Sequence, residues 1–416
     1  MKGRPRVDAF RLMRRIDQYV GPPICLLLGA VKFLLGRRRP RAGGAGEIRK
    51  VLVIKFWGLG SIVLSTPALR ALKKKYPRAS ITFLTFEQNA GACRMIRAID
   101  RVRPYRARGP LSFLASFAGL FLFLRRERFD AVVDLEAFSN FTSILTALSG
   151  APVTVGFHTP KFWRQRFYWQ RVAFDHSQHI ADIFLKAARA LGADADGNQL
   201  DALDAGGGDA EPALERLLAE RSVAATESLV CINVNSSPLD YKRRWPLAHY
   251  RELIARILSG FGEFRLVLIG ARDEAPYVAE LTRSLPAHPN LIDLCGRITV
   301  EQLVLLLQRS DLFIGNDSGP LHLAVAAGTP TVSFFGPETP ALYGPRGEGH
   351  LVLYKDLPCS PCLNVYHSKE NSSCRDNVCM KSIEVEEAWT AVRERLRAAS
   401  RRRSMAIAGD ARVACR

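Results

Sequence analysis

The sequence predicts an α/β protein built from two doubly wound domains. Between residues 50 and 155, and again between residues 228 and 334, short apolar runs alternate with longer helix-like segments. Strands and helices in this order form parallel sheets with helices on both faces. The chain has 416 residues, too many for one ordinary core, and 48% of them are apolar, which is ample for two buried sheets.

The predicted strands are apolar runs bounded by turn residues. They are Lys50–Lys55, Ser80–Phe86, Ala131–Leu135 and Pro152–Val155, then Ser228–Asn233, Arg265–Ile269, Leu312–Ile314 and Thr331–Phe334. The predicted helices are Ser61–Tyr76, Leu111–Arg126, Leu247–Leu258, Glu274–Leu285, Val300–Gln308, Pro320–Ala327 and a last one, Val385–Ala398. Leu111–Leu124 is very apolar for such a helix. We expect it to be buried, and the alternative is that it faces a membrane.

The two series are separated by Gly192–Asp209, an acidic, Gly- and Ala-rich stretch without periodicity. Such composition is typical of an interdomain connection. We therefore predict a basic, apolar, membrane-associating extension at 1–48, a Rossmann-like domain at 49–195, a linker at 196–225, a second Rossmann-like domain at 226–400 and a basic tail at 401–416.

The formal net charge of +19 is concentrated at the two ends of the chain. Residues 1–50 hold 13 Lys and Arg against three acidic residues, which gives +10, and the stretch from Ala391 onward gives +6. Nucleic-acid binding would call for an evenly basic groove, so we predict no nucleic-acid partner. Basic ends beside apolar runs favour an anionic membrane surface or an anionic lipid acceptor.

Gly21–Gly36 is the most apolar stretch near the start, and Arg37-Arg38-Arg39 follows it. Lys32 interrupts it, and it is shorter than the ~20 residues of a spanning helix. No small-residue cleavage site follows, so it is not a secretory signal. We predict an in-plane or re-entrant anchor on the cytoplasmic face of the inner membrane. The alternatives are a single span and a helix that packs on the folded domain.

Two turns carry the chemical signal. Gly58-Leu59-Gly60 matches only part of G-x-G-x-x-G, because Val63 stands at the third glycine position, so a dinucleotide site is weakly supported. The turn offers helix N–H groups to an anion or an acceptor, or simply needs glycine for its dihedral angles.

The second turn, Asn316–Pro320, follows a strand and starts a helix. Its first-turn N–H groups and Ser318 can hold a pyrophosphate, to which His322 adds a donor. The alternative is an ordinary capped helix in which Asp317 satisfies backbone N–H groups.

With these motifs the chain resembles glycosyltransferase family 9, the ADP-heptose:lipopolysaccharide heptosyltransferases and their relatives. The resemblance runs from about Lys50 to Ala398. It implies the GT-B fold, with two Rossmann-like domains facing a cleft, and an inverting transferase of lipopolysaccharide and cell-envelope biosynthesis. Such an enzyme moves a sugar from a nucleotide diphosphate, ADP-heptose in this family, to a lipopolysaccharide-core or other lipid-linked saccharide and needs no metal or other cofactor. The pieces that carry it are Val51–Pro77, Asp130–Phe157, Ile232–Ile254 and Ser310–Pro345.

The resemblance also implies a donor site in the second domain. Hydroxyl residues there contact phosphate oxygens, a basic residue before Trp245-Pro246 neutralises the leaving diphosphate, and an acid binds the ribose. The residues at these positions are Ser236 and Ser237, Lys242 and Arg243, Glu274, and the turn Asp317, Ser318, Gly319 and His322.

On the acceptor side, the turn Gly58, Gly60 and Ser61 departs from the family, which has Asp at the position of Ser61. Serine does not take up a proton at neutral pH without a base of its own. Glu136, at the end of the third predicted strand, is the best candidate for the base. Otherwise the acceptor and the base differ, or the chain is an inactive relative that binds nucleotide sugar or glycolipid as a partner subunit. Arg164, with His158 and Lys161, contacts an acidic acceptor or belongs to an ordinary solvated loop.

The nine cysteines fall into two groups. Cys359, Cys362, Cys374 and Cys379 cluster near the end, where the spacing fits a structural zinc site or free or redox-paired thiols. The other five are scattered and indicate a reducing compartment. They are Cys25, Cys93, Cys231, Cys295 and Cys415.

Overall fold

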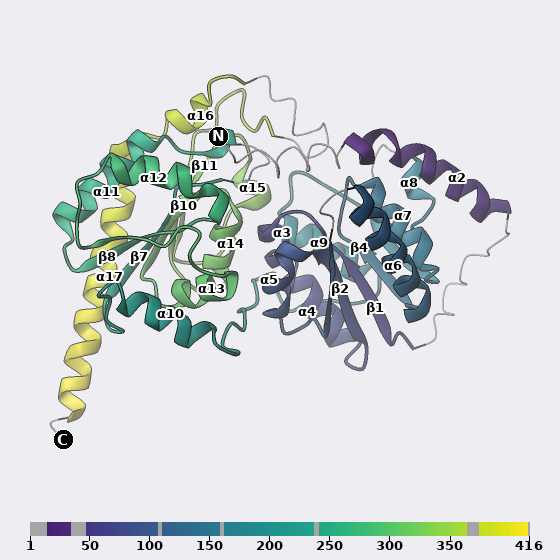
Figure 1. Ribbon diagram of the computed structural model, residues 1–416, viewed down its shortest axis with the longest axis horizontal. Coiled ribbons are helices and arrows are strands. Elements are labelled where there is room, and N and C mark those ends of the chain that lie inside the picture. Colours follow the sequence, from purple (N-terminus) through teal and green to yellow (C-terminus); the bar gives the residue numbers. More distant parts are fainter. Residues whose placement is uncertain are drawn as a thin grey trace. The chain divides into compact units, whose positions relative to one another are not determined.

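A computed structural model describes residues 15–34, 47–106, 110–158, 162–236, 241–363 and 374–414. It divides the chain into two compact units, unit 1 (Met1–Asp204) and unit 2 (Ala205–Arg416) (Figure 1). Ser237 and Lys161 lie outside the described residues, as do Arg37, Arg38 and Arg39.

Unit 1 is built on a six-stranded sheet in the order β3-β2-β1-β4-β5-β6, and every pairing is parallel. Its strands are β1 (Lys50–Ile54), β2 (Ser80–Phe86), β3 (Arg101–Tyr105), β4 (Ala131–Asp134), β5 (Val153–His158) and β6 (Gln170–Ala173). Its helices are α2 (Gly21–Leu34), α3 (Leu59–Val63), α4 (Thr66–Lys75), α5 (Ala90–Arg94), α6 (Pro110–Glu127), α7 (Asn140–Ser149), α8 (Phe162–Gln165) and α9 (Ile180–Arg189).

Unit 2 repeats this plan with the order β12-β11-β10-β7-β8-β9, again parallel throughout. Its strands are β7 (Ser228–Asn233), β8 (Phe264–Leu268), β9 (Leu291–Asp293), β10 (Leu312–Asn316), β11 (Thr331–Phe335) and β12 (His350–Tyr354). Its helices are α10 (Ala210–Ala219), α11 (Leu247–Gly260), α12 (Ala275–Arg283), α13 (Val300–Gln308), α14 (Gly319–Ala326), α15 (Pro340–Tyr343), α16 (Val378–Lys381) and α17 (Val385–Ala414). Single turns η1 (Glu87–Asn89), η2 (Tyr241–Arg243) and η3 (Arg272–Glu274) complete the two units.

Both sheets reverse their winding at one place, which is where ligands of open α/β sheets bind. In unit 1 this switch point lies between β1 and β4, where Ile54 stands opposite Asp134. In unit 2 it lies between β7 and β10, where Asn233 stands opposite Gly315. The glycine turn and the Asn316–Pro320 turn, both singled out by the sequence, each follow a strand of a switch point.

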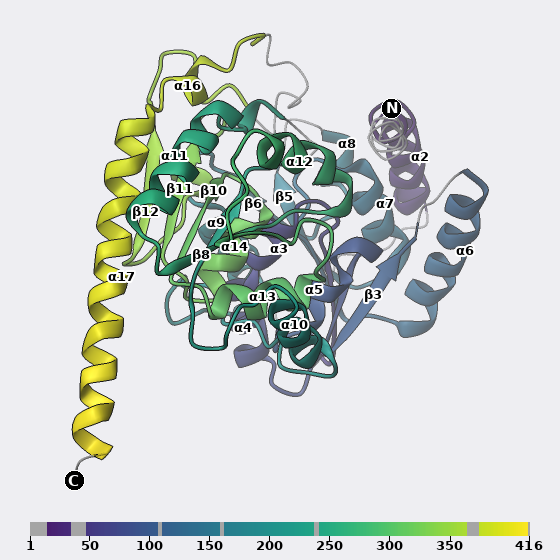
Figure 2. The same cartoon turned by 60° about the vertical axis from the view of Figure 1, so that its left-hand side comes forward.

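The eight predicted strands are confirmed to within a few residues, whereas β3, β6, β9 and β12 were not predicted. The predicted helix Ser61–Tyr76 is divided into α3 and α4. The last helix does not end at Ala398 but continues to Ala414 through most of the predicted basic tail (Figure 2). The carboxylate of Asp311 holds this extension, because it accepts two hydrogen bonds from the Arg403 guanidinium, at 3.1 and 3.0 Å.

The predicted linker at 196–225 is shared between the units. The backbone N–H of Asp201 donates to Thr66 Oγ1 (3.1 Å), and that of Asp204 donates to the carbonyl of Met95 (2.8 Å), so this part is fastened to unit 1. The part that follows forms α10, which contacts α13 of unit 2.

The apolar segment at the start of the chain forms α2, which contacts α7 and α8 of unit 1. This is the arrangement expected of a helix that packs on the folded domain. Within the described residues, the helices are all too short or too polar to cross a membrane.

The core of unit 2 is centred on Trp245, whose ring stacks on Phe334 of β11 at 4.3 Å between centroids. Burying two large rings in face contact stabilises this end of the sheet. Trp245 lies two residues after Arg243, the last residue of η2, so the same packing helps to fix the position of Arg243, which the sequence predicted as a site residue.

Candidate functional site

The glycine turn of unit 1 leaves β1 at the switch point. Gly58 has φ of +82°, which L-residues rarely adopt, and a Cβ there would stand 3.1 Å from Ser61 Oγ. Gly58 is therefore needed for its backbone conformation. Gly60 is buried within α3, a helix of five residues that is too short to form an anion site at its N-terminus.

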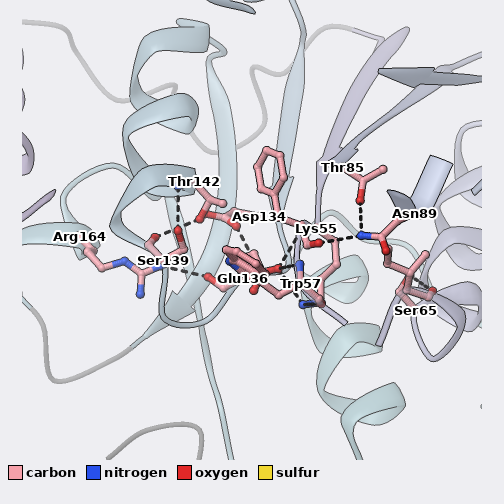
Figure 3. A network of polar contacts seen from close by, with 12 residues as sticks. Lys55, Trp57, Ser65, Thr85, Asn89, Asp134, Glu136, Ser139, Thr142 and Arg164 are labelled. Atoms are coloured by element: carbon pink, nitrogen blue, oxygen red, sulfur yellow. Dashed lines mark hydrogen bonds and ion pairs between the residues drawn. The ribbon is translucent and has the colours of Figure 1, made fainter. Parts of the chain in front are cut away.

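The turn is held by a buried ion pair between Lys55 and Glu136 (Figure 3). Glu136 Oε1 accepts three hydrogen bonds, from Lys55 Nζ (2.9 Å) and from the backbone N–H groups of Phe56 (2.9 Å) and Trp57 (2.7 Å). Lys55 Nζ also donates to the carbonyl of Trp57 (2.8 Å). One carboxylate and one ammonium thus fix three consecutive residues before the glycines.

Asn89 supports the same turn from the other side. Its Nδ2 donates to the carbonyl of Phe56 (2.8 Å) and to Thr85 Oγ1 (3.2 Å). The sequence reasoning missed Asn89 and Lys55. A signal for Lys55 was available, since it is a charged residue directly after an apolar strand.

Asp134 ends β4 opposite Ile54 and is fully buried. Its Oδ1 accepts the backbone N–H of Glu136 (2.9 Å), and its Oδ2 accepts the hydroxyl of Tyr168 (2.6 Å). Burial raises the pKa of Asp134 to about 6, although Arg164 and these hydrogen bonds act in the opposite direction. Asp134 therefore fixes the backbone from which Glu136 projects.

Arg164 has a different place from the one expected on the acceptor. Its side chain is only 1% exposed. Nε donates to Ser143 Oγ (2.8 Å), Nη2 to the carbonyl of Glu136 (3.0 Å) and Nη1 to the carbonyl of Ala137. We correct the prediction accordingly: Arg164 braces the loop after β4, and its donors are used inside unit 1.

Ser61 lies half-buried in α3 beside Gly58. Among the residues that the structure describes, none hydrogen-bonds to Ser61 Oγ. The expected base, Glu136, is buried and engaged by three donors. The geometry therefore favours a positioning role for Glu136, and its role as a base stays a prediction.

The turn after β10 in unit 2 brings together three of the predicted donor residues, Arg243, Asp317 and His322. Arg243 Nη1 and Asp317 Oδ2 form a buried ion pair at 2.9 Å. Ser318 Oγ accepts from Asn233 Nδ2 (3.0 Å) and makes no capping bond to α14, which begins at Gly319. Asp317 thus pairs with an arginine, and the first-turn N–H groups of α14 are not capped by Ser318.

Asn316 links the end of β10 to the segment that carries Arg243 and Trp245. Its Nδ2 donates to the carbonyls of Val234 (3.1 Å) and Asn235 (3.0 Å), while its Oδ1 accepts the backbone N–H of Trp245 (2.9 Å). One amide side chain thereby ties the ends of β7 and β10 to η2 and brings Arg243 to Asp317. The sequence reasoning placed Asn316 at the start of the predicted turn but gave it no role; in the structure it is the last residue of β10.

His322 lies in the first turns of α14, is 3% exposed, and has no hydrogen-bond partner at Nδ1. Burial lowers the pKa of His322 to about 4, with Asp317 opposing this shift and Arg243 adding to it. The imidazole is therefore neutral at neutral pH.

His322 should make the stability of unit 2 sensitive to acid. Its folded pKa of about 4 lies below an unfolded value of about 6.5, so its contribution is present above pH 6.5 and is lost as the pH falls towards 4. We expect a loss on the order of 2 kcal/mol between pH 7 and pH 4.5. Urea unfolding at both pH values measures it. The difference should shrink by this amount in His322→Gln but not in His158→Gln, which changes an exposed histidine. If the difference in stability between the two pH values is the same in His322→Gln as in the wild type, His322 is not the source of the acid sensitivity.

Glu274, the predicted ribose ligand, lies in η3 at the end of β8. Its Oε2 accepts the backbone N–H of Ala271 (2.7 Å), and a Cβ at Gly270 would stand 3.2 Å from that oxygen and 2.6 Å from Asn235 Nδ2. Burial raises the pKa of Glu274, and Arg244 opposes the shift. The carboxylate thus lies near Asn235, which follows β7.

Arg244, which lowers the pKa of this carboxylate, is itself held by two aromatic rings. The Arg244 guanidinium lies over the rings of Tyr241 (4.3 Å) and Tyr277 (3.8 Å), an arrangement that holds a cation in place. Of the remaining predicted donor residues, Ser236 is buried and Lys242 is half-buried in η2.

Of the four clustered cysteines, Cys359, Cys374 and Cys379 are free thiols. Cys379 is buried, Cys359 is exposed, and Cys362 and Cys374 are intermediate. Within the described ranges, no group of three or more His, Cys, Asp or Glu side chains is arranged to hold a metal ion. The zinc alternative therefore gains no support from the described residues.

Comparison with known proteins gives one consistent result. The profile of Glycosyltransferase family 9 (heptosyltransferase) matches residues 119–372, more than half of the chain. Lipopolysaccharide heptosyltransferase 3 of Escherichia coli is 24% identical over 313 residues, covering 72% of this chain and 88% of the relative.

Solved structures show the same fold at low sequence identity. A family 9 glycosyltransferase from Veillonella parvula is 22% identical, with a TM-score of 0.68 over 84% of this chain and 98% of the other. An E. coli heptosyltransferase solved with ADP is 19% identical, with a TM-score of 0.62 over 83% and 99%. The two parallel sheets are thus the two Rossmann-like domains of the GT-B class, and the chain belongs to glycosyltransferase family 9.

Proposed function

We propose that the protein transfers heptose from ADP-heptose to a saccharide of the lipopolysaccharide core, with inversion at the sugar. The observation that carries this proposal is the buried group of Arg243, Asp317 and His322 at the start of α14. Family membership and the names of the relatives agree with it, since the relative from E. coli is a lipopolysaccharide heptosyltransferase and a similar structure contains ADP.

On this proposal the donor diphosphate binds at the N-terminus of α14. Uncapped N–H groups at a helix start favour an anion, and Arg243 adds a positive charge that is already oriented by Asp317. Charge developing on the leaving diphosphate would be stabilised by groups that need no rearrangement, the usual source of large rate effects. Neutral His322 offers a further hydrogen-bonding nitrogen, and Glu274 lies where the ribose would be held.

The acceptor would bind at the glycine turn of unit 1. Lys55 and Glu136 keep this turn in one conformation, so the acceptor meets a preorganised backbone. We infer that Glu136 is a positioning residue. The double variant Lys55→Met/Glu136→Gln distinguishes this positioning role from a role of Glu136 as the base.

The proposal is tested with purified protein, ADP-heptose and lipopolysaccharide-core acceptor. We expect ADP to bind by isothermal titration calorimetry and ADP to be released only when both substrates are present. Ser61→Asp restores the family's acid. If this chain already has a base, we expect the substitution to change the rate by at most about tenfold. If the chain lacks a base, the new carboxylate should raise the rate by about 10²–10⁴-fold.

A second function is favoured by Ser61, whose hydroxyl makes no hydrogen bond to a base among the described residues. An inactive relative would bind the nucleotide sugar or the glycolipid as a partner subunit. This function is established, and the first excluded, if the wild type binds ADP-heptose without ever transferring it and Ser61→Asp gains activity.

The acceptor of the proposed reaction is lipid-linked, so the enzyme is proposed to act peripherally at the cytoplasmic face of the inner membrane. The nucleotide sugar, the glycolipid and the membrane surface are the partners that this function implies.

A further inference from the structure

The inward face of α2 consists mainly of small residues, and Leu28 is partly buried beside them. Gly21, Cys25 and Gly29 follow one another at intervals of four and are buried against α7 and α8. A Cβ at Gly21 would stand 2.5 Å from Asn140 Cβ, so the helix lies as close to α7 as glycine allows. Cys25 packs with Ile144 and Phe167.

The start of this segment is fastened to α7 by polar contacts as well. Asp17 Oδ2 accepts the backbone N–H of Asn140 (3.0 Å), and Oδ1 accepts that of Phe141 (2.6 Å). A carboxylate at this place satisfies the free N–H groups of a helix start. The orientation of α2 on unit 1 is thus fixed along its length.

The outward face of the same segment is made of large apolar residues. Thirteen large apolar side chains are exposed among the described residues, and eight of them lie between residues 16 and 34. Leu27 is 65% exposed and Leu34 is 81% exposed. This is the reverse of an ordinary surface helix, which turns its large apolar residues towards the core. The other six are Ile16, Tyr19, Val20, Ile24, Leu26 and Val31.

The helix α6 extends this surface. It contacts α7, as α2 does, and Figures 1 and 2 both show α2 and α6 flanking α7. Phe121 and Leu122 are exposed on α6, although Leu120 and Leu124 are buried. The expectation that this helix is buried therefore holds for Leu120 and Leu124 but not for Phe121 and Leu122. Ten of the thirteen exposed large apolar side chains lie on α6 or between residues 16 and 34.

The border of this surface is cationic. Arg15, Arg125, Arg126 and Arg166 are exposed, and Arg166 lies beside α2, since its Cδ is 3.6 Å from where a Cβ of Gly29 would be. The sequence continues beyond α2 with Arg37-Arg38-Arg39. No Asp or Glu occurs between residues 18 and 34 or between 110 and 126.

We propose that the outward faces of α2 and α6 form a docking surface for a bilayer that contains anionic phospholipid, with α2 lying in the plane of the headgroups. Large apolar residues enter the acyl boundary and arginines meet the phosphates, as in amphipathic membrane-surface helices. A second copy of the chain fits less well, because a two-fold contact on this face would bring the same arginines together. This membrane-docking surface extends the proposed function. Vesicle binding, which tests it, can be measured without any transfer activity.

The test measures co-sedimentation of the full chain with vesicles of phosphatidylglycerol and phosphatidylethanolamine or of phosphatidylcholine alone. We expect the wild type to prefer the anionic vesicles by at least tenfold and to lose binding as NaCl is raised from 50 to 500 mM. Leu27→Glu and Leu34→Glu are each expected to weaken binding about tenfold or more, and Leu122→Glu severalfold. Met405→Glu is the matched control, because Met405 is 72% exposed on α17.

Three outcomes overturn the proposal. The first is binding by Leu27→Glu and Leu34→Glu that equals the wild type. The second is equal binding to both kinds of vesicle. The third is a dimer in sedimentation velocity that Leu27→Glu dissociates while vesicle binding is unchanged. Transfer to a detergent-solubilised acceptor, measured in the same variants, reports on the proposed function separately and should be unaffected.

Discussion

Arg243→Met is expected to abolish transfer and to destabilise unit 2. The substitution leaves the Asp317 carboxylate buried without its guanidinium, which costs about 3–5 kcal/mol. It also removes the positive charge proposed to stabilise the leaving diphosphate, for which we expect a fall in kcat/KM of at least about 10². Urea unfolding and the rate of ADP release measure the two effects.

The double variant Arg243→Met/Asp317→Leu separates folding from chemistry. Replacing both members of a buried pair by apolar residues is often close to neutral for stability. We therefore expect the double variant to regain most of the lost stability and to remain inactive. Arg251→Met, an exposed arginine on α11, serves as the control. Recovery of transfer together with stability would show that Arg243 is only structural.

Lys55→Met is expected to destabilise unit 1 by about 3–5 kcal/mol, because Glu136 would keep a buried charge without its partner. Glu136→Gln alone is expected to be destabilising for the same reason, because it leaves the buried Lys55 ammonium without its carboxylate partner. The double variant Lys55→Met/Glu136→Gln removes both charges, while the glutamine oxygen can still accept the N–H groups of Phe56 and Trp57. Its stability should be close to that of the wild type.

The activity of this double variant decides the role of Glu136. If Glu136 positions the turn, the folded double variant keeps kcat within about tenfold and mainly raises the KM for the acceptor. If Glu136 is the base, kcat falls by about 10²–10⁴ although the fold is intact. A pH profile of kcat that keeps its acidic limb in the double variant would also exclude Glu136 as the base.

The central strands could be predicted from the sequence and the edge strands could not. Strands β1, β4, β7 and β10 are covered on both faces and read as continuous apolar runs. The four missed strands, β3, β6, β9 and β12, are the edges of the two sheets. An edge strand has one neighbour and partial burial, so β3 holds two arginines and a proline, and β6 alternates in exposure.

The sequence singled out both members of the Arg243–Asp317 ion pair, through the resemblance of their motifs to the family, whereas their role at a donor site stays a prediction. The contacts around them were not predictable, since Asn316, Asn235 and Asn233 act through hydrogen bonds between strands distant in the chain. For Arg164 and Glu136 the sequence showed charged residues near a strand end. Whether such a charge faces a ligand or a buried backbone depends on packing that spacing does not encode.

The hydrogen bonds between Asp17 and the start of α7 have a practical consequence for anyone who shortens this chain. Cutting away the first forty-five residues would strip two backbone amides of their acceptor and expose Ile144 and Phe167 to water. We expect the shortened protein to aggregate. A loss of vesicle binding in it would then not show whether α2 contacts lipid. Substitutions on the outward face of α2 leave the contacts of Asp17 intact, so they are the proper way to test the proposed membrane contact.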